Sequence, residues 1–346
     1  MSPTDDDDAE RPQPPHPRET TALFGHADAE RALLDNYRSG RVAHAWLIAG
    51  PAGIGKATLS YRMARFVLAH PDPSAPAVQA ATSLAVAPDH PVARRIAAQA
   101  HADLLVLERT VGDTGKLRTV ITVDEVRRTV SFFGSTAGEG GWRVCVVDTA
   151  DELQYPQASN ALLKVLEEPP PRSLFLLASH EPARLLPTIR SRCRRLTLRP
   201  LAEADVIAAA SAALDVPQSD ADLRKAAGLA EGSVAQAIAL SGGALLDLRE
   251  RVVGLLHQLP AVDARALHAL GDGLERADDA LFKMFVETVQ DWLSARLRDT
   301  ADKARLARIA DAWERLNRAI TDVDTFNLER KPLVFSVFGL LGEAVR

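Results

Sequence analysis

The chain has 346 residues, of which 47% are hydrophobic and 25% charged, with a formal net charge of -5 at pH 7; this length predicts two or three globular domains. No stretch is apolar enough to cross a membrane and no apolar signal core begins the chain, so we expect a cytoplasmic protein. The small net charge does not indicate nucleic-acid binding, and the two cysteines, Cys145 and Cys193, argue against a disulfide framework.

The chain begins with a segment rich in Asp, Pro and Arg, residues 1–21, which we expect to be a disordered tail. Residues 22–200 alternate predicted strands and helices, which is typical of an α/β fold with a parallel sheet covered by helices on both faces. Strand signals stop after this region. Residues 201–244 predict a small helical lid, and 245–346 predict an all-α C-terminal domain. The strands are expected at 46–49, 103–107, 144–148, 174–178 and 196–198.

A phosphate loop with the sequence GPAGIGK lies between the first predicted strand and the helix that follows it. Gly50, Gly53 and Gly55 allow successive backbone N–H groups to turn toward one anion at a helix N-terminus. Lys56 would reach the outer phosphates of a nucleotide. The sequence therefore predicts a P-loop fold in which phosphate binding is retained.

The residue after this loop departs from the motif. It is Ala57, where ATP hydrolysis needs a Ser or Thr hydroxyl to hold Mg²⁺. Thr58 carries the next hydroxyl, but on a helix it lies about 100° around the axis and roughly 1.5 Å further along, which makes it a poor substitute. The loop is therefore a stronger indication of the P-loop fold than of ATP hydrolysis. We expect that the protein requires no cofactor. Whether the loop still binds ATP or ADP stays open.

Two further stretches precede the next motif. Residues 70–101 are rich in Pro and Ala and indicate an insertion, which we expect to fold on apolar residues such as Val78, Leu84 and Val86. Residues 123–133 show a helical period with acidic residues in the first turn, and this helix is expected to pack on the sheet. Its apolar positions are Val123, Val126, Val130 and Phe133.

The predicted strand at 144–148 ends in Asp148, where a nucleotide-binding strand places the carboxylate associated with Mg²⁺. An Asp that only caps the following turn is the alternative. The next residue is Thr149, although hydrolysis in this class of ATPase uses a glutamate there to orient or deprotonate the attacking water. Asp151 and Glu152 begin the next loop and are expected to point elsewhere.

The most distinctive segment of the chain is NALLKVLEEPP at 160–170, followed by FLLASHEP at 175–182 and IRSRC at 189–193. Without further comparison, the first segment is an amphipathic helix halted by prolines. Together the three segments resemble the bacterial clamp-loader family, the AAA+ subunits of the DNA polymerase III holoenzyme, over about residues 24–200. The resemblance implies an AAA+ P-loop domain at 22–200, a lid at 201–244 and an oligomerising collar at 245–346.

The resemblance also implies that Arg192, in Ser-Arg-Cys, is an arginine finger that acts on the ATP site of a neighbouring subunit. A permanently charged, planar guanidinium stabilises the transferring phosphoryl group, by about 10³- to 10⁵-fold in rate. Ser179 falls at the family's polar sensor position near the phosphates, although a Ser that caps a strand end is the alternative. The neighbouring arginines are each interpreted as solvated surface charges: Arg190, Arg194, Arg195 and Arg199.

Family members that respond to ATP carry a Gly-Ser-x-Arg motif in the lid, and this chain has Ala235 in place of the arginine. Together with Ala57 and Thr149, this is a third loss at one site, which predicts a chain without intrinsic ATPase activity. Many subunits of the family also have a four-cysteine zinc module, but residues 71–89 contain no cysteine here. We therefore expect no zinc or other bound metal.

These observations lead us to expect a non-hydrolysing clamp-loader subunit that helps to load the sliding clamp on primed DNA during replication, within a complex that has DNA-directed DNA polymerase activity. The implied partners are loader subunits of the tau/gamma and delta types, with the clamp and the primer-template DNA reached through the complex, and no membrane. Any direct DNA contact would be to backbone phosphates through Arg127 and Arg128.

The alternative function is that of an ATP-hydrolysing AAA+ motor, such as the tau/gamma-type subunit or a related remodelling enzyme. An intact hydroxyl after the loop and an Asp-Glu pair at the strand end would favour it, and neither is present. A metabolic kinase is a third class, and nothing outside the phosphate loop resembles an acceptor-substrate site.

Overall fold

The computed structural model describes residues 14–112, 115, 117–134, 141–277, 279–299, 302–326 and 328–345. The chain divides into two compact units, Met1–Ile238 and Ala239–Arg346, and each is described by itself. Residues 1–13 of the predicted tail lie outside the described residues. The division between the units falls within the predicted lid, 201–244, and the three boundaries between the four predicted segments stay predictions.

The first unit is built on a parallel sheet, which confirms the predicted fold class. Its strands are ordered β2-β3-β4-β1-β5, and all the pairings are parallel. Because β1 lies between β4 and β5, Ala49 at its end is level with Ser179 on one side and Thr197 on the other. The strands are β1 (Ala45–Ala49), β2 (Leu104–Glu108), β3 (Arg143–Asp148), β4 (Ser173–Ser179) and β5 (Arg194–Thr197).

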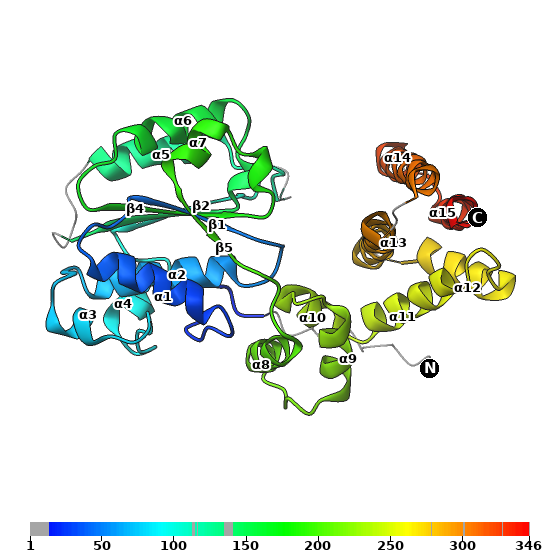
Figure 1. Ribbon diagram of the computed structural model, residues 1–346, viewed down its shortest axis with the longest axis horizontal. Helices are drawn as coiled ribbons and strands as arrows, with labels where there is room; N and C mark the ends of the chain where they lie inside the picture. Colours follow the sequence, from blue (N-terminus) through cyan, green and yellow to red (C-terminus); the bar gives the residue numbers. More distant parts are fainter. Residues whose placement is uncertain are drawn as a thin grey trace, which may run out of the picture. The chain divides into compact units, whose positions relative to one another are not determined.

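Helices cover both faces of this sheet (Figure 1). Successive side chains of a strand point to opposite faces, so Trp46 and Ile48 join one apolar cluster while Ala45 and Leu47 join another. The first cluster includes side chains of α1 (Ala27–Arg38) and α2 (Lys56–Ala69). The second includes side chains of α5 (Val123–Gly134), α6 (Gln157–Glu167) and α7 (Pro187–Arg192).

The predicted insertion forms two short helices, α3 (Pro76–Ala80) and α4 (Pro91–Ala97). Val78, Leu84 and Val86 are buried and belong to the same apolar cluster as α2. The prediction that this segment folds on these three side chains is therefore confirmed, because its hydrophobic residues extend the core beneath the sheet.

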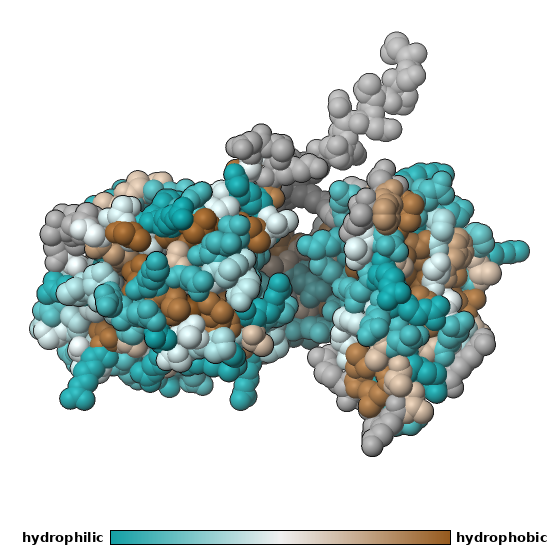
Figure 2. Space-filling model, turned by 90° about the horizontal axis from the view of Figure 1, so that it is seen from above, coloured by the Kyte–Doolittle hydropathy of each residue, from teal (hydrophilic) through white to brown (hydrophobic). Residues whose placement is uncertain are grey.

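The predicted packing of α5 is correct in part. Val126 and Phe133 are buried, but Val130 is 64% exposed, so its prediction as a core residue is wrong. Thr129 takes the position on the sheet-facing stripe instead, and its hydroxyl donates to the carbonyl of Val126 at 2.6 Å. Figure 2 looks onto the face covered by α5, α6 and α7, where hydrophobic residues lie scattered among hydrophilic ones.

Three helices follow the sheet: α8 (Glu203–Leu214), α9 (Ala221–Leu229) and α10 (Val234–Leu240). All three lie within the predicted helical lid, 201–244. Val206, Leu223 and Ala237 are buried in a small apolar cluster of their own. The Asp220 carboxylate accepts from the backbone N–H of Leu223 at 2.8 Å, which caps the start of α9.

The second unit is helical throughout its named elements. Its core includes Phe285, Val289, Ile309 and Leu316, and the spacings of four and seven residues place each pair on one face of its helix. Within the described residues, no helix combines the length and the apolar character needed to span a bilayer. The helices are α11 (Ala244–His257), α12 (Ala264–Glu275), α13 (Asp279–Asp299), α14 (Lys303–Phe326) and α15 (Arg330–Val345).

Candidate functional site

The phosphate loop joins β1 to α2, which confirms the strand, loop and helix context that the motif requires. Gly50, Gly53 and Gly55 all have positive φ, at 152°, 73° and 99°. A Cβ at Gly50 would come within 2.7 Å of the Leu198 carbonyl oxygen. Glycine is therefore needed both for the positive φ and for the close approach of the backbone that follows β5.

The lid helix α10 lies directly on this loop. The backbone N–H of Ala235 donates to the Gly53 carbonyl at 3.2 Å. A Cβ added at Gly53 would stand 2.2 Å from Ser233 Oγ and 2.8 Å from Ala235 Cβ. The residue found where an arginine was expected thus packs against the loop itself, and its small size permits this contact.

Lys56 begins α2 with its ammonium group turned toward its own loop. Nζ donates to the Gly50 carbonyl at 2.8 Å and also to that of Pro51. The residue is only 4% exposed, and burial lowers its pKa to about 8, against the attraction of Asp148 and Asp151. The lysine predicted to bind outer phosphates is therefore satisfied by the protein backbone in this structure.

Asp148 ends β3 beside Thr149 and His180. Burial raises the pKa of Asp148, and His180, His16 and Lys56 oppose this effect through their charges. Thr149 Oγ1 lies 3.5 Å from Asp148 Oδ1 and 3.4 Å from His180 Nε2. Burial also lowers the pKa of His180. A hydroxyl that bridges a carboxylate and an imidazole occupies the place where a glutamate would activate water.

Ser179 ends β4 with its hydroxyl already bonded. It donates to Asp151 Oδ1 at 2.6 Å, and the backbone N–H groups of His180 and Glu181 donate to the other carboxylate oxygen. The sequence treated Asp151 as a loop residue that points elsewhere, whereas it fixes the end of the neighbouring strand. The available signal was an acidic residue, Asp151, three residues after the Asp that ends β3. A single sequence does not reveal that its partner lies at the end of β4.

A cavity of about 500 Å³ opens beside the loop. It brings together most of the predicted nucleotide-site residues with part of the lid and part of the N-terminal segment. Ser179 and Gly50 are not among its lining residues, although both lie at the ends of strands next to it. From the predicted set, the cavity is lined by Gly53, Gly55, Lys56, Thr58 and Asp148.

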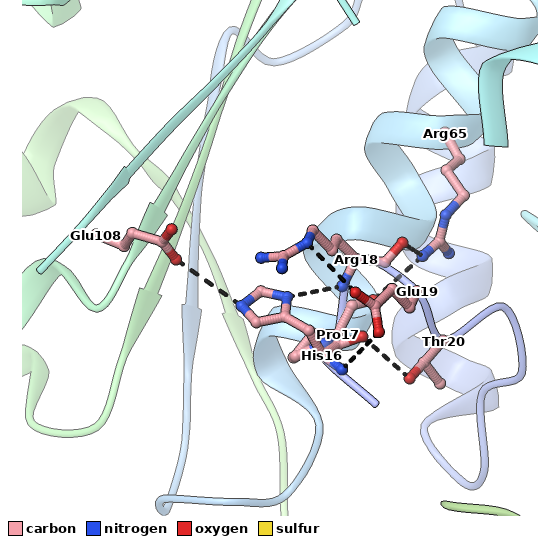
Figure 3. Close-up of polar contacts among 7 residues, drawn as sticks. All are labelled: His16, Pro17, Arg18, Glu19, Thr20, Arg65 and Glu108. Atoms are coloured by element: carbon pink, nitrogen blue, oxygen red, sulfur yellow. Dashed lines mark hydrogen bonds and ion pairs between the residues drawn. The ribbon is translucent and has the colours of Figure 1, made fainter. Parts of the chain in front are cut away.

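One wall of this cavity comes from residues 14–21, which the sequence placed in a disordered tail. The guanidinium of Arg65, a residue only 2% exposed, donates to the carbonyls of Pro17 at 3.1 Å and Arg18 at 2.8 Å (Figure 3). The His16 ring stands edge-on to Tyr61, with Nε2 3.8 Å from Glu108 Oε2. The prediction of a tail is therefore wrong for these residues, because a buried cation needs acceptors and takes them from this backbone.

Arg192 lies outside the residues that line this cavity, at the C-terminal end of α7. Its Nη2 pairs with Glu167 Oε1 at 2.8 Å, and its Nη1 donates to the Thr188 carbonyl at 3.0 Å. The side chain is 35% exposed. The structure thus separates the predicted arginine finger from the chain's own phosphate loop and gives it an acidic partner that sequence reasoning missed.

The other arginines singled out by the sequence differ in their surroundings. Arg194 lies over the ring of Trp46, 4.8 Å from its centroid, so it is more than a solvated charge. Arg127 pairs with Asp124 at 3.0 Å, and Arg128 pairs with a carboxylate of the same helix. Contact of α5 with DNA stays a prediction, and it would require these ion pairs to rearrange.

Comparison with known proteins places these features in a family. A family model described as DNA polymerase III, delta subunit, matches residues 25–202. DNA polymerase III subunit delta' of Pseudomonas aeruginosa is 37% identical over 212 residues, which make up 61% of this chain and 60% of the relative. The subunit of the same name from Escherichia coli is 32% identical over 238 residues, 68% of this chain and 66% of that protein.

Two more distant similarities extend further along the chain. DNA polymerase III subunit tau/gamma of Haemophilus influenzae is 25% identical over 288 residues, 80% of this chain and 39% of the relative. A solved DNA polymerase III gamma subunit-related protein from Thermotoga maritima is 17% identical, with a TM-score of 0.44, and the match covers 91% of this chain and 100% of that one. The matches to the delta' relatives span less than two thirds of the length of those proteins.

Proposed function

The chain belongs to the family described as DNA polymerase III, delta subunit, and we propose that it is a delta-prime-type clamp-loader subunit that does not itself hydrolyse ATP. In this role it would complete the ATP site of a neighbouring subunit with Arg192 and help to load a sliding clamp on primed DNA. The two delta' relatives, at 37% and 32% identity, support this type of subunit over others in the loader.

The residues of the chain's own site support the absence of hydrolysis. Ala57 offers no hydroxyl for Mg²⁺, Thr149 offers no carboxylate for water activation, and Ala235 offers no lid cation. The lost groups would hold Mg²⁺, activate the attacking water and bind the nucleotide, respectively. The occurrence of all three substitutions at one site supports a subunit that has the P-loop fold but does not hydrolyse ATP.

Internal contacts also occupy the groups that would meet a nucleotide. Lys56 donates to loop carbonyls, Ser179 donates to Asp151, and Ala235 binds Gly53. ATP or ADP would have to displace at least the lysine contacts, with a free-energy cost, before its phosphates could bind. We therefore propose that the chain works without a bound nucleotide or zinc, and that residual nucleotide binding is weak.

One arrangement supports the arginine-finger role most directly. Arg192 lies at the end of a helix, partly exposed and apart from the cavity of its own chain, while belonging to the Ser-Arg-Cys segment. A guanidinium so placed is suited to reach a phosphate that another molecule holds. In a ring of related subunits, that phosphate would belong to ATP bound by the adjacent subunit, where a cation has the greatest effect on rate.

The partners follow from the same proposal. They would be loader subunits of the tau/gamma and delta types, held in part by the helical second unit as a collar, with clamp and primer-template DNA bound by the assembled complex. The similarity to the tau/gamma subunit of Haemophilus influenzae, which covers 80% of this chain, supports such a shared architecture. Work on replicating DNA would place the chain in the bacterial cytoplasm.

A hydrolysing tau/gamma-type subunit is the second candidate. The complete loop from Gly50 to Lys56 and the 25% identity to a tau/gamma subunit over 288 residues favour it. Incubation of the purified chain with ATP and Mg²⁺ separates the two candidates. Phosphate release well above the level of a Lys56→Ala variant would favour the motor, and equal release by both would favour the non-hydrolysing subunit.

The role of Arg192 is tested in the assembled loader with clamp and primed DNA. Loss of an arginine finger slows its own ATP site by about 10³-fold or more, while other sites in the ring still contribute. We therefore expect Arg192→Ala to lower total ATP turnover by about the share contributed by the one site that it completes. Arg190→Ala, which removes an exposed arginine of the same helix, is the matched control and should retain turnover. Unchanged turnover by Arg192→Ala at equal assembly would leave the chain as a scaffold.

A further inference from the structure

An acidic side chain accompanies the proposed finger at the end of a second helix. Glu167 is the last residue of α6, and Arg192 is the last residue of α7. Their side chains meet with 2.8 Å between Glu167 Oε1 and Arg192 Nη2. Arg192 Nη1 also donates to Thr188 O at 3.0 Å and lies 3.5 Å from Ser191 Oγ. The guanidinium therefore rests against α7 with one carboxylate as its counter-charge.

The core, and not this ion pair, brings the two helix ends together. Leu162 and Leu166 of α6 share a buried apolar cluster with Ile189 and Cys193 at α7. All four side chains are at most 9% exposed. Because hydrophobic burial holds the helices in place, loss of the Glu167 charge should leave α6 and α7 where they are. The pair can consequently be altered without unfolding the site.

Another anion can replace Glu167 as the partner of Arg192. The Arg192 and Glu167 side chains are 35% and 42% exposed, so solvent screens their attraction. Exposed ion pairs of this kind stabilise proteins only slightly. A triphosphate carries more negative charge than one carboxylate and can accept two parallel N–H bonds from a guanidinium. A phosphate group brought close by a neighbour would therefore outcompete Glu167.

From this geometry we propose that Glu167 is a positioning residue for Arg192: it holds the guanidinium against α7 in the resting subunit and gives it up when the neighbour's ATP binds. This inference rests on the proposed arginine-finger function. Glu167 makes no contact with the reacting atoms. Its charge instead sets how much free energy is needed to transfer Arg192 from the resting contact to the phosphate.

This role affects ATP binding and turnover differently. The contact with Glu167 is present before ATP binds and is broken both in the ATP-bound ground state and in the transition state. Its loss would strengthen both bound states equally relative to the free subunit, which changes KM and leaves kcat unaltered. An orienting role would have the opposite signature, because loss of orientation would lower kcat.

The test uses the reconstituted loader with clamp and primed DNA, and compares Glu167→Gln with the wild type. Gln keeps the size of the side chain and removes its charge. We expect KM for ATP to fall by about two- to fivefold, the range of an exposed ion pair, with kcat unchanged. Equilibrium binding of a non-hydrolysable ATP analogue to the same complexes should tighten by the same factor. Glu167→Asp, which keeps the charge, should return KM toward the wild-type value.

Glu168→Gln is the matched control, since this exposed neighbour forms no ion pair within the described part of the chain. It should leave both KM and kcat unchanged. A fall in kcat for Glu167→Gln, or an unchanged KM, would overturn the inference. Arg192→Ala, measured in parallel, distinguishes failure of the finger role from failure of the positioning role. If neither variant has an effect, the finger role of Arg192 is rejected. If only Arg192→Ala loses turnover, the positioning role of Glu167 alone is rejected.

Discussion

The Ser179 hydroxyl donates to Asp151 Oδ1 over 2.6 Å, so a side chain from the loop after β3 fixes the end of β4. The same carboxylate accepts backbone N–H groups of His180 and Glu181. Hydrogen bonds to a charged acceptor are stronger than neutral ones, and donors left unpaired are costly. Asp151 is thus expected to contribute to the local stability of this edge of the sheet.

We predict that Asp151→Asn lowers the free energy of opening at the end of β4 by about 2 kcal/mol, because the amide replaces one acceptor oxygen with a donor. Hydrogen exchange of the amides at 177–181 measures this change. Asp124→Asn, which removes an exposed carboxylate paired with Arg127 on α5, should change exchange there by less than about 0.5 kcal/mol. Equal protection in Asp151→Asn and wild type would contradict the role assigned to this carboxylate.

Gly53→Ala should displace the lid. The new Cβ would meet Ser233 Oγ at 2.2 Å and Ala235 Cβ at 2.8 Å, in addition to the strain of φ at 73°. We expect the amide of Ala235 to lose most of its protection from hydrogen exchange, as its bond to Gly53 O breaks. Gly40→Ala supplies the control, because Gly40 has a similar φ of 69° and nothing within 4 Å of the added Cβ.

The Gly40 variant should therefore be destabilised by about 1 kcal/mol from backbone strain alone, with the lid amides unaffected. The difference between the two variants isolates the contact between loop and lid. If both variants leave Ala235 equally protected, the lid does not depend on this contact.

Lys56 gives a pH dependence with a defined sign. Burial lowers its pKa to about 8 from the ordinary 10.5, so between these values the unfolded chain binds more protons than the folded one. The contribution of this group to stability therefore rises with pH across that window. Relative to Lys56→Met, the wild type should gain about 2 kcal/mol of unfolding free energy between about pH 7.5 and pH 9.5.

Urea unfolding of both proteins at the two pH values measures this gain. The comparison with Lys56→Met cancels other groups that titrate in alkali, including Tyr37 and Tyr61, whose pKa values burial raises. A constant difference between the two proteins at both pH values would show that Lys56 titrates normally in the folded chain.

Arg65→Met should release the N-terminal segment. The substitution keeps an apolar side chain in the core but removes the donors to the carbonyls of Pro17 and Arg18. Because each bond from a charged donor contributes about 1.5–3 kcal/mol, we expect trypsin to cleave after Arg18 at least about tenfold faster. Mass spectrometry of the product that begins at Glu19 gives the rate. The control variant Arg94→Met, at an exposed position of α4, should be cleaved after Arg18 at the wild-type rate.

Periodicity and motif spacing predicted much of this molecule because those signals are local. The strand that ends at Asp148, the loop from Gly50 to Lys56 and the helix stopped before Pro169 are all encoded by neighbouring residues. The helical pattern of α5 was identified, yet Val130 was assigned to the wrong face. Thr129 and Val130 are adjacent on the helix, and hydropathy alone favours the valine for the core.

The contacts that the sequence could not supply join distant segments. Arg65 binds the backbone near residue 17, Asp151 binds Ser179, and Arg192 pairs with Glu167. Each partner is a common polar residue whose separation along the chain shows no pattern. Only the folded sheet, which sets the ends of β3 and β4 side by side and packs α6 on α7, brings these groups within bonding distance.

The contact of Ala235 with Gly53 bears on whether the proposed loss of ATPase activity could be reversed by successive substitutions. A hydroxyl after the loop could return by the single change Ala57→Ser, but Ala235→Arg would start from a Cβ that already touches the loop. The longer side chain would force the lid away before any of the other missing groups was restored. Intermediate sequences would then lack both the docked lid and catalysis. Under the proposed function, the docked lid would therefore prevent ATPase activity from being recovered one substitution at a time.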